Sequence, residues 1–262
     1  MKNVFAFLLF SFLSIQAQNI KIVASKINSL PFEDKNFVGR DFYGYNYFDD
    51  QAVFSKTKRK EHWEYKNVSL GHLTKIDLNN PLKIVLFYQD FNAVVLLDNQ
   101  LSETQKILFF QSELPISVKA TGIAAQNQLW VYNNLNQQIG LYNYLNNTYK
   151  TISIPFPDNI QFYQTDFNHF YWIDDKNIAF VCNLFGKITT LFQIPKYDWI
   201  EFINEQQYIY SKDHQFYLLD NSQNKKYEIE IVEKTFQKCY YKDQILSIFT
   251  TEGITNYKII TP

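Results

Sequence analysis

The feature that most constrains the fold of this sequence is a recurring unit of about 40 residues. Each clear copy contains an apolar, strand-like run, a polar turn, and a second apolar run that ends near an Asn or Asp. These second runs recur at intervals of about 36 to 45 residues and lie at 94–98, 139–143, 179–183, 216–220 and 254–257. Asn and Asp tolerate positive φ angles, so they can occupy the turn positions that glycine usually takes in a chain that has only 7 glycines.

The repeat predicts an all-β chain, since no stretch after the N-terminus has the three- and four-residue apolar spacing of an amphipathic helix. Its period is close to that of a four-stranded blade, so we expect a β-propeller of about six blades. Five and seven blades remain alternatives because 35–76 is irregular, and a large β-sandwich or a pair of β domains is the other architecture considered. The apolar run 20–24 is expected to complete the last blade and remove the unpaired strand edges of an open ring.

The N-terminus has the layout of a cleavable signal peptide. Lys2 precedes an apolar stretch at 4–15, which ends at Gln16, Ala17 and Gln18. A transmembrane helix needs about 20 apolar residues, so this stretch is too short, and no later segment reaches that length. We therefore expect a signal peptide at 1–17, a single propeller domain at 18–262, export to the periplasm, and no transmembrane segment in the mature chain.

Charge excludes one large class of partners. The 25 Lys and Arg residues balance 26 Asp and Glu residues, which gives a formal net charge of −1. Binding to the phosphates of a nucleic acid requires a basic surface, so no nucleic-acid partner is expected.

The sequence contains no familiar catalytic or cofactor-binding motif. His62, His72, His169 and His214 include no pair with metal-ligand spacing, and neither Gly-x-Ser-x-Gly nor a glycine-rich phosphate loop occurs. We therefore expect no catalytic residues, no metal, no cofactor and no enzymatic activity of a familiar kind. Cys182 and Cys239 lack a Cys-x-x-Cys spacing; two separately buried thiols are favoured over the disulfide that export would permit.

The aromatic content, 18% of the chain, is the feature most suggestive of recognition. Two segments outside the clear repeats are rich in aromatic residues, and Pro155 and Pro157 favour a loop in the second. Rigid aromatic side chains in loops are typical of protein-binding surfaces, and aromatic rows also stack on sugar rings. The candidate interaction surface consists of Tyr43, Tyr45, Tyr47, Phe48, Phe156, Phe162, Tyr163 and Phe167.

The signal-peptide end at Gln16, Ala17 and Gln18 and the enrichment in Asn, Lys, Ile, Phe and Tyr resemble exported, all-β envelope proteins of Bacteroidota. Among these, the chain looks similar to plug-type subunits of the type IX secretion translocon. The resemblance implies an accessory or plug subunit, associated with the outer membrane, that docks on an envelope protein such as a large outer-membrane β-barrel. A carbohydrate-binding or carbohydrate-active propeller is the alternative function, and a purely structural assembly subunit is a third.

Overall fold

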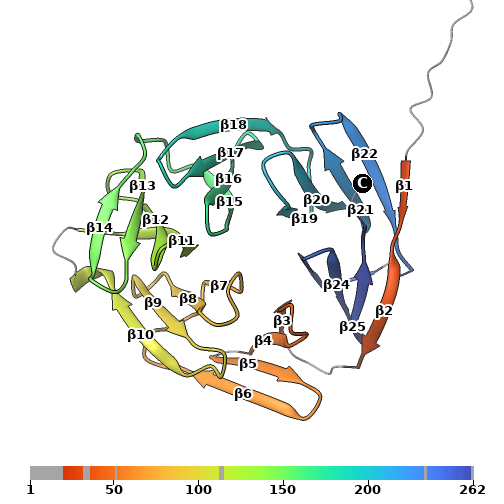
Figure 1. Ribbon diagram of the computed structural model, residues 1–262, viewed down its shortest axis with the longest axis horizontal. Helices are drawn as coiled ribbons and strands as arrows, with labels where there is room; N and C mark the ends of the chain where they lie inside the picture. Colours follow the sequence, from red (N-terminus) through yellow and green to blue (C-terminus); the bar gives the residue numbers. More distant parts are fainter. Residues whose placement is uncertain (1–19, 32–35, 51, 112–114, 233–234, 261–262) are drawn as a thin grey trace, which may run out of the picture.

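Six sheets form a closed ring in the computed structural model, and their strands are antiparallel except for one added edge strand (Figure 1). The model describes residues 20–31, 36–50, 52–111, 115–232 and 235–260. The expected β-propeller of six blades is confirmed, and a β-sandwich is excluded. The expected signal peptide at 1–17 lies outside the described residues.

Within each blade the strands follow one another from the centre of the ring to its rim. The first and second blades contain β3 (Asn36–Arg40), β4 (Asn46–Asp50), β5 (Val53–Lys58) and β6 (Glu61–Lys66), then β7 (Lys75–Asp77), β8 (Ile84–Tyr88), β9 (Ala93–Leu97) and β10 (Glu103–Leu108). A 3-10 turn, η1 (Phe109–Gln111), follows. The third and fourth contain β11 (Val118–Ala124), β12 (Gln128–Asn133), β13 (Gln138–Asn143) and β14 (Thr148–Thr151), then β15 (Ile160–Thr165), β16 (His169–Asp174), β17 (Ile178–Asn183) and β18 (Ile188–Gln193). The fifth and sixth contain β19 (Trp199–Phe202), β20 (Gln207–Lys212), β21 (Gln215–Asp220) and β22 (Lys225–Glu230), then β23 (Lys238–Lys242), β24 (Ile245–Thr250) and β25 (Gly253–Lys258).

The N-terminal strands close the ring differently from the expectation. β2 (Ser25–Leu30) pairs with β25 and completes the sixth blade, whereas β1 (Ile20–Val23) pairs in parallel with β22 as a fifth strand of the fifth blade. The prediction that 20–24 completes the last blade is therefore wrong. Its apolar signal comes from Ile22 and Ala24, which pack between the fifth and sixth blades. β2 itself is polar and held by hydrogen bonds, so apolar patterning could not reveal it.

Hydrophobic packing lies between the blades. Six apolar clusters each join side chains of two neighbouring sheets; one of them packs Phe37 and Phe48 of the first blade against Phe249 and Ile254 of the sixth. The second and third strands supply most of this core, and every residue of β8 and β9 is buried. The innermost strands contribute fewer residues to these clusters, among them Phe37, Ile123 and Ile200, and they also present polar side chains to the central channel.

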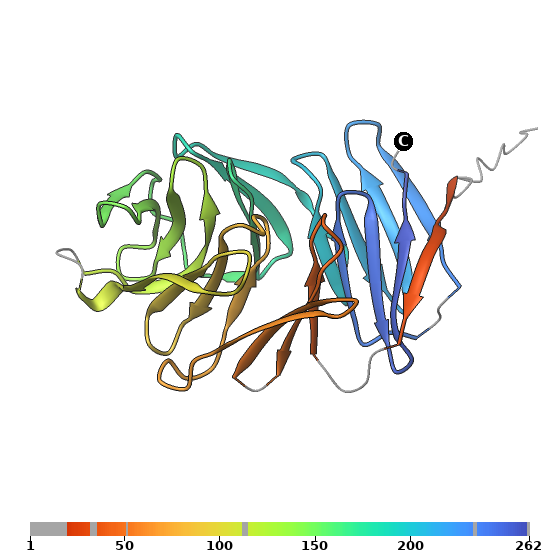
Figure 2. The same cartoon turned by 60° about the horizontal axis from the view of Figure 1, so that its bottom comes forward.

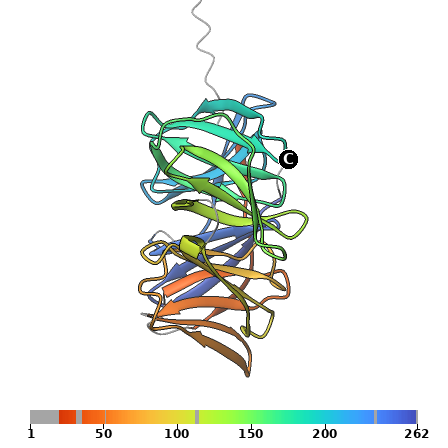
Figure 3. The ribbon, with the colours of Figure 1, turned by 90° about the vertical axis from the view of Figure 1, so that its left-hand side faces the viewer.

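The ring has two faces, seen at either side of the strands in Figures 2 and 3. We call the N face the one at which the innermost strands begin; its described loop residues include 67–74, 213–214, 231–232 and 235–237. We call the C face the one at which they end; its loops include 41–45, 166–168 and 184–187.

Ring closure depends on a buried polar contact between β2 and β25. The fully buried Asn256 donates from Nδ2 to Asn28 Oδ1 at 2.7 Å and accepts from Ser247 Oγ at 2.6 Å.

We expect Asn256→Ala to lower the free energy of unfolding by about 2 kcal/mol, because the Ser247 hydroxyl loses its acceptor. Urea titration checks this, with the exposed turn variant Asn146→Ala as control, expected to cost under about 0.5 kcal/mol. Equal effects of the two variants would contradict the closure role.

Candidate functional site in the channel

A large cavity opens at the N-face mouth of the channel. Its volume is about 520 Å³, and its walls come from the first, second, fifth and sixth blades. Acidic, basic and aromatic side chains share the lining, which comprises Asp49, Asp198, Lys75, Lys238, His214, Phe37, Trp199 and Phe236 together with seven other residues. The volume lies in the range of cavities that bind small molecules or inserted side chains.

One wall of this mouth cavity is a packed aromatic group. Trp199 meets Phe216 edge to face, with ring centroids 6.1 Å apart. Phe236 lies 4.8 Å from Phe216 and 5.7 Å from the His214 ring. Because Phe216 is fully buried, the partly exposed Trp199 and Phe236 are supported from behind and present fixed surfaces.

A narrower cavity of about 210 Å³ continues into the channel. It shares Val38, Lys75, Ile76, Trp199 and Cys239 with the mouth cavity, so the two are adjoining parts of one space. Its lining adds Asp77 and Glu201, two carboxylates on inner strands.

Three hydrogen bonds fix the position of the Asp77 carboxylate. Its Oδ2 accepts from Ile123 N at 2.8 Å and from Thr165 Oγ1 at 3.2 Å, and Oδ1 accepts from Asn79 N at 2.7 Å. A Cβ at Gly122 would lie 2.0 Å from Thr165 Oγ1, so glycine is required for this contact to form across β11. Asp77 thus ties three blades together.

Glu201 and Lys75 are less constrained. Glu201 Oε2 accepts one hydrogen bond, from Tyr241 N at 3.2 Å, and burial raises the pKa of Glu201 to about 7. Lys75 Nζ makes a long contact of 3.5 Å with Tyr163 O and lies 5.0 Å from the Tyr163 ring centroid, and burial lowers its pKa. The channel therefore holds an acid and a base whose proton affinities are shifted toward each other, an arrangement that suits proton exchange or recognition of a charged ligand.

Cys239 lies where the two cavities meet, but it is not an activated nucleophile. Burial raises the pKa of its thiol, and the nearby Glu201 acts in the same direction. Cys182 is buried elsewhere, and both cysteines are free. The expectation of two separate thiols is confirmed.

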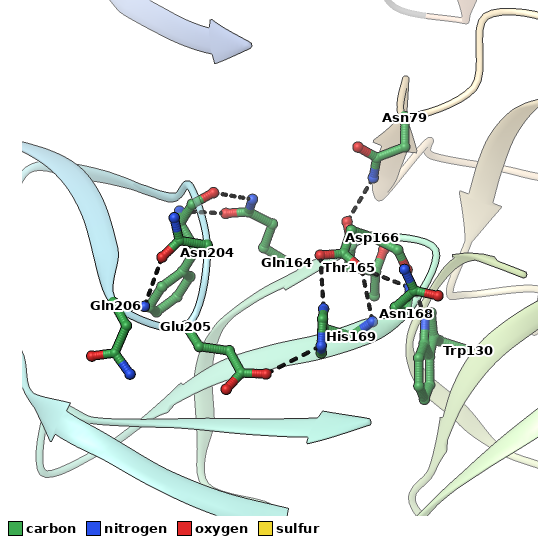
Figure 4. A network of polar contacts seen from close by, with 11 residues as sticks. Asn79, Trp130, Gln164, Thr165, Asp166, Asn168, His169, Asn204, Glu205 and Gln206 are labelled. Atoms are coloured by element: carbon green, nitrogen blue, oxygen red, sulfur yellow. Dashed lines mark hydrogen bonds and ion pairs between the residues drawn. The ribbon is translucent and has the colours of Figure 1, made fainter. Parts of the chain in front are cut away.

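A second polar cluster fastens the blades on the C face (Figure 4). His169 Nδ1 lies 3.2 Å from Asp166 Oδ2, and its Nε2 lies 3.2 Å from Glu205 Oε1 of the fifth blade. Trp130 of the third blade donates to the Asp166 carbonyl at 2.8 Å. Within the ranges that the structure describes, no group of three His, Cys, Asp or Glu residues could hold a metal ion.

The aromatic residues predicted from sequence do not form one surface. Tyr47 and Phe48 are fully buried, so they belong to the core and not to an interaction surface. Their alternation with polar residues reflects a central blade strand whose two faces are both covered by neighbouring sheets. Phe156 is packed between Tyr132 and Trp172, at centroid distances of 4.9 and 4.6 Å.

The remaining predicted residues occupy separate places. Phe162 lines the inner cavity, and Tyr163, beside it on β15, stacks on Phe170. Tyr43 and Phe167 are exposed on the C face, in the first and fourth blades, and Tyr45 packs edge to face on Trp63. Only Phe162 therefore contributes to the lining of the channel cavities.

The comparisons with known proteins identify the architecture. No family model and no curated protein matches the sequence. Virginiamycin B lyase from Staphylococcus aureus superposes with a TM-score of 0.54 at 16% identity, over 88% of this chain and 83% of that one. A DUF4221 family member from Bacteroides vulgatus gives 0.57 at 9% identity over 92% and 97%, and the Swd1 propeller domain of Myceliophteria thermophila gives 0.53 at 8% over 91% and 100%. At these identities the likeness shows the fold alone.

The expectation that the chain is not an enzyme is corrected by these structures. It was based on the absence of familiar catalytic motifs. Virginiamycin B lyase and a streptogramin B lyase, at 16% and 14% identity, have the same architecture and are enzymes. Missing motifs therefore do not exclude catalysis on this fold, and the fold by itself does not establish it.

A membrane-spanning helix is not found among the residues that the structure describes.

The titration of Glu201 gives a pH-dependent prediction. Its folded-state pKa of about 7 lies above the ordinary value of 4.5. Between pH 4.5 and about pH 7 the folded protein therefore binds more protons at Glu201 than the unfolded chain does. The free energy of unfolding falls as the pH rises through this range. Glu201→Gln removes this titration and keeps an acceptor for Tyr241 N, so the variant should gain about 1 to 3 kcal/mol relative to the unsubstituted protein between about pH 5 and pH 8.

Denaturant unfolding at the two pH values measures this gain, with the exposed turn variant Glu252→Gln as the control for loss of a carboxylate. If the free energy of unfolding depends on pH in the same way for Glu201→Gln and the unsubstituted protein, folding does not raise the pKa of Glu201.

Proposed function

We propose that the protein is an interaction module of the cell envelope that binds a partner protein through its N face. A segment of the partner would enter the mouth cavity and contact the aromatic wall and the surrounding charges. The observation that carries the proposal is the mouth cavity of about 520 Å³ on this face, lined by four of the six blades.

Exposed apolar side chains do not distinguish the two faces. Val68 and Val232 on the N face are each 76% exposed, and Phe185 on the C face is 91% exposed. The cavity distinguishes them, because binding energy concentrates where aromatic anchors and charges surround a pocket that excludes water. Trp199 and Phe236 provide the aromatic part, and Lys238, Asp198 and His214 provide charged or titratable groups at the rim.

The location of the partner in this proposal rests on sequence. The signal-peptide layout at 1–18 supports export, and the overall composition supports a Bacteroidota envelope protein. We propose a periplasmic protein associated with the outer membrane, with a large β-barrel of a type IX secretion translocon as the partner for which it would act as an accessory or plug subunit.

Charge reversal at the mouth tests the choice of face. Lys238 is exposed at the cavity rim, and Lys187 is exposed in a C-face loop. In an affinity capture of residues 18–262 from gently solubilised envelopes, Lys238→Glu should reduce recovery of the partner at least about tenfold. Lys187→Glu should leave it unchanged. Equal recovery with both variants would move the interface away from the N face.

Carbohydrate binding is the second candidate, and a specific observation favours it. Asp49 and Asp198 share the mouth cavity with Trp199 and Phe236, which is the acid and aromatic grouping expected of a sugar site. Aromatic faces would stack on a sugar ring while the carboxylates accept its hydroxyl hydrogen bonds.

A glycan panel tests this candidate. Asp198→Asn keeps an acceptor for Asp213 N, which now donates to Asp198 Oδ2 at 2.8 Å, so the loop should remain folded. We expect this variant to weaken glycan binding about tenfold, because a charged acceptor is lost. An unsubstituted protein that neither binds nor cleaves any glycan of a broad panel would eliminate the candidate.

A further inference from the structure

A separate cavity of about 210 Å³ opens on the C face, between the first and sixth blades. Arg40, Asp41 and Phe42 line it from one side, and Tyr240, Lys242 and Asp243 line it from the other. It shares Tyr240 with the inner cavity but no lining residue with the mouth cavity on the N face, so a ligand of this C-face cavity would bind apart from the partner segment of the proposed function.

The guanidinium of Arg40 is the notable group in this C-face cavity. Its Nε and Nη1 are buried, and among the described residues they have no hydrogen-bond partner. A buried donor without an acceptor is unfavourable, and a buried charged donor is more so. Native structures satisfy nearly all such groups through protein, water or a bound ligand.

The local backbone is shaped around this side chain. Gly44 has a φ of +86°, and a Cβ at this position would lie 3.1 Å from Arg40 Nη2. Glycine therefore permits both the left-handed turn at 41–45 and the close approach of the guanidinium to it.

The charge of the Asp41 carboxylate acts on Arg40, but its oxygens are hydrogen-bonded to other groups. Asp41 accepts from Tyr45 N at 2.9 Å and from Tyr47 Oη at 2.7 Å, and it lies 3.9 Å from Lys56 Nζ. Asp243 is exposed at the rim. On the opposite wall, Lys242 adds a second positive charge while donating to the Leu78 carbonyl at 3.2 Å.

We propose that this C-face cavity binds a small oxyanion, a carboxylate or a phosphate group, through the Arg40 guanidinium, with Lys242 as the second cation. The planar guanidinium presents several donors in the geometry that such oxyanions accept. A volume of about 210 Å³ suits a small ion or one terminal group, because it is below the range of about 300 to 1,000 Å³ typical of whole-ligand pockets.

Calorimetric titration of residues 18–262 with sodium phosphate, and separately with sodium acetate, tests the proposal at constant ionic strength in chloride. We expect saturable binding of at least one anion to a single site. Arg40→Gln should weaken that binding at least about tenfold. The control is Arg59→Gln. Arg59 is the only other arginine of the chain and lies in an exposed turn, so this variant should change the affinity for the anion less than about twofold. Binding of acetate alone assigns a carboxylate site, and binding of phosphate alone assigns a phosphate site.

Thermal unfolding separates a binding role from a structural one. Because Nε and Nη1 of Arg40 have no partner among the described residues, Arg40→Gln should unfold in chloride at the Tm of the unsubstituted protein or above it. The bound anion should raise the Tm of the unsubstituted protein and not that of the variant. Arg40→Lys, which keeps the charge and loses the planar donor set, should show intermediate binding. No saturable binding of either anion to the folded unsubstituted protein, or equal binding by Arg40→Gln, would overturn the proposal.

Discussion

The structure depends on face-to-face packing between neighbouring sheets, which is complete only when the ring is closed. β2 supplies the outer strand of the last blade, and the buried Asn256 links that strand to β25 and β24. Six interblade clusters then contain the buried apolar side chains. Closure therefore joins six small sheets into one cooperative unit, since each sheet alone would leave an apolar face exposed.

This placement of the core makes a polar channel possible. The second and third strands of each blade supply most of the interblade packing, so some side chains of the inner strands, such as Asp77, Lys75 and Glu201, can line the channel. Asp77 accepts three hydrogen bonds, two of which join blades, whereas Glu201 and Lys75 have shifted pKa values and few partners. The channel thus combines a rigid frame with two adaptable charges beneath the mouth cavity.

The period of the apolar runs was sufficient to predict the fold, because each run is a central blade strand with both faces buried. The inner strands escaped detection: β7 has three residues, and β19 and β23 mix charged with apolar residues. Lys75 and Glu201 lie on these strands. Lys and Glu are usually surface residues, so the sequence does not single them out, and only the closed ring brings the two side chains together. The aromatic residues were misleading for the opposite reason, since Tyr47 and Phe48 look like a recognition row but fill the space between blades. Nothing in the sequence marked Arg40, because the absence of partners for its Nε and Nη1 among the described residues follows from how the chain packs.

The central claim is that recognition occurs at the N-face mouth of the channel. Site-specific photo-crosslinking in intact cells tests it most directly, with the crosslinking residue placed at Gln237, exposed at the mouth, or at Phe185, exposed on the C face. The account predicts a discrete covalent adduct with an envelope protein from position 237 and none from position 185. An adduct from position 185 alone, or none from position 237 while the protein is folded, would contradict it.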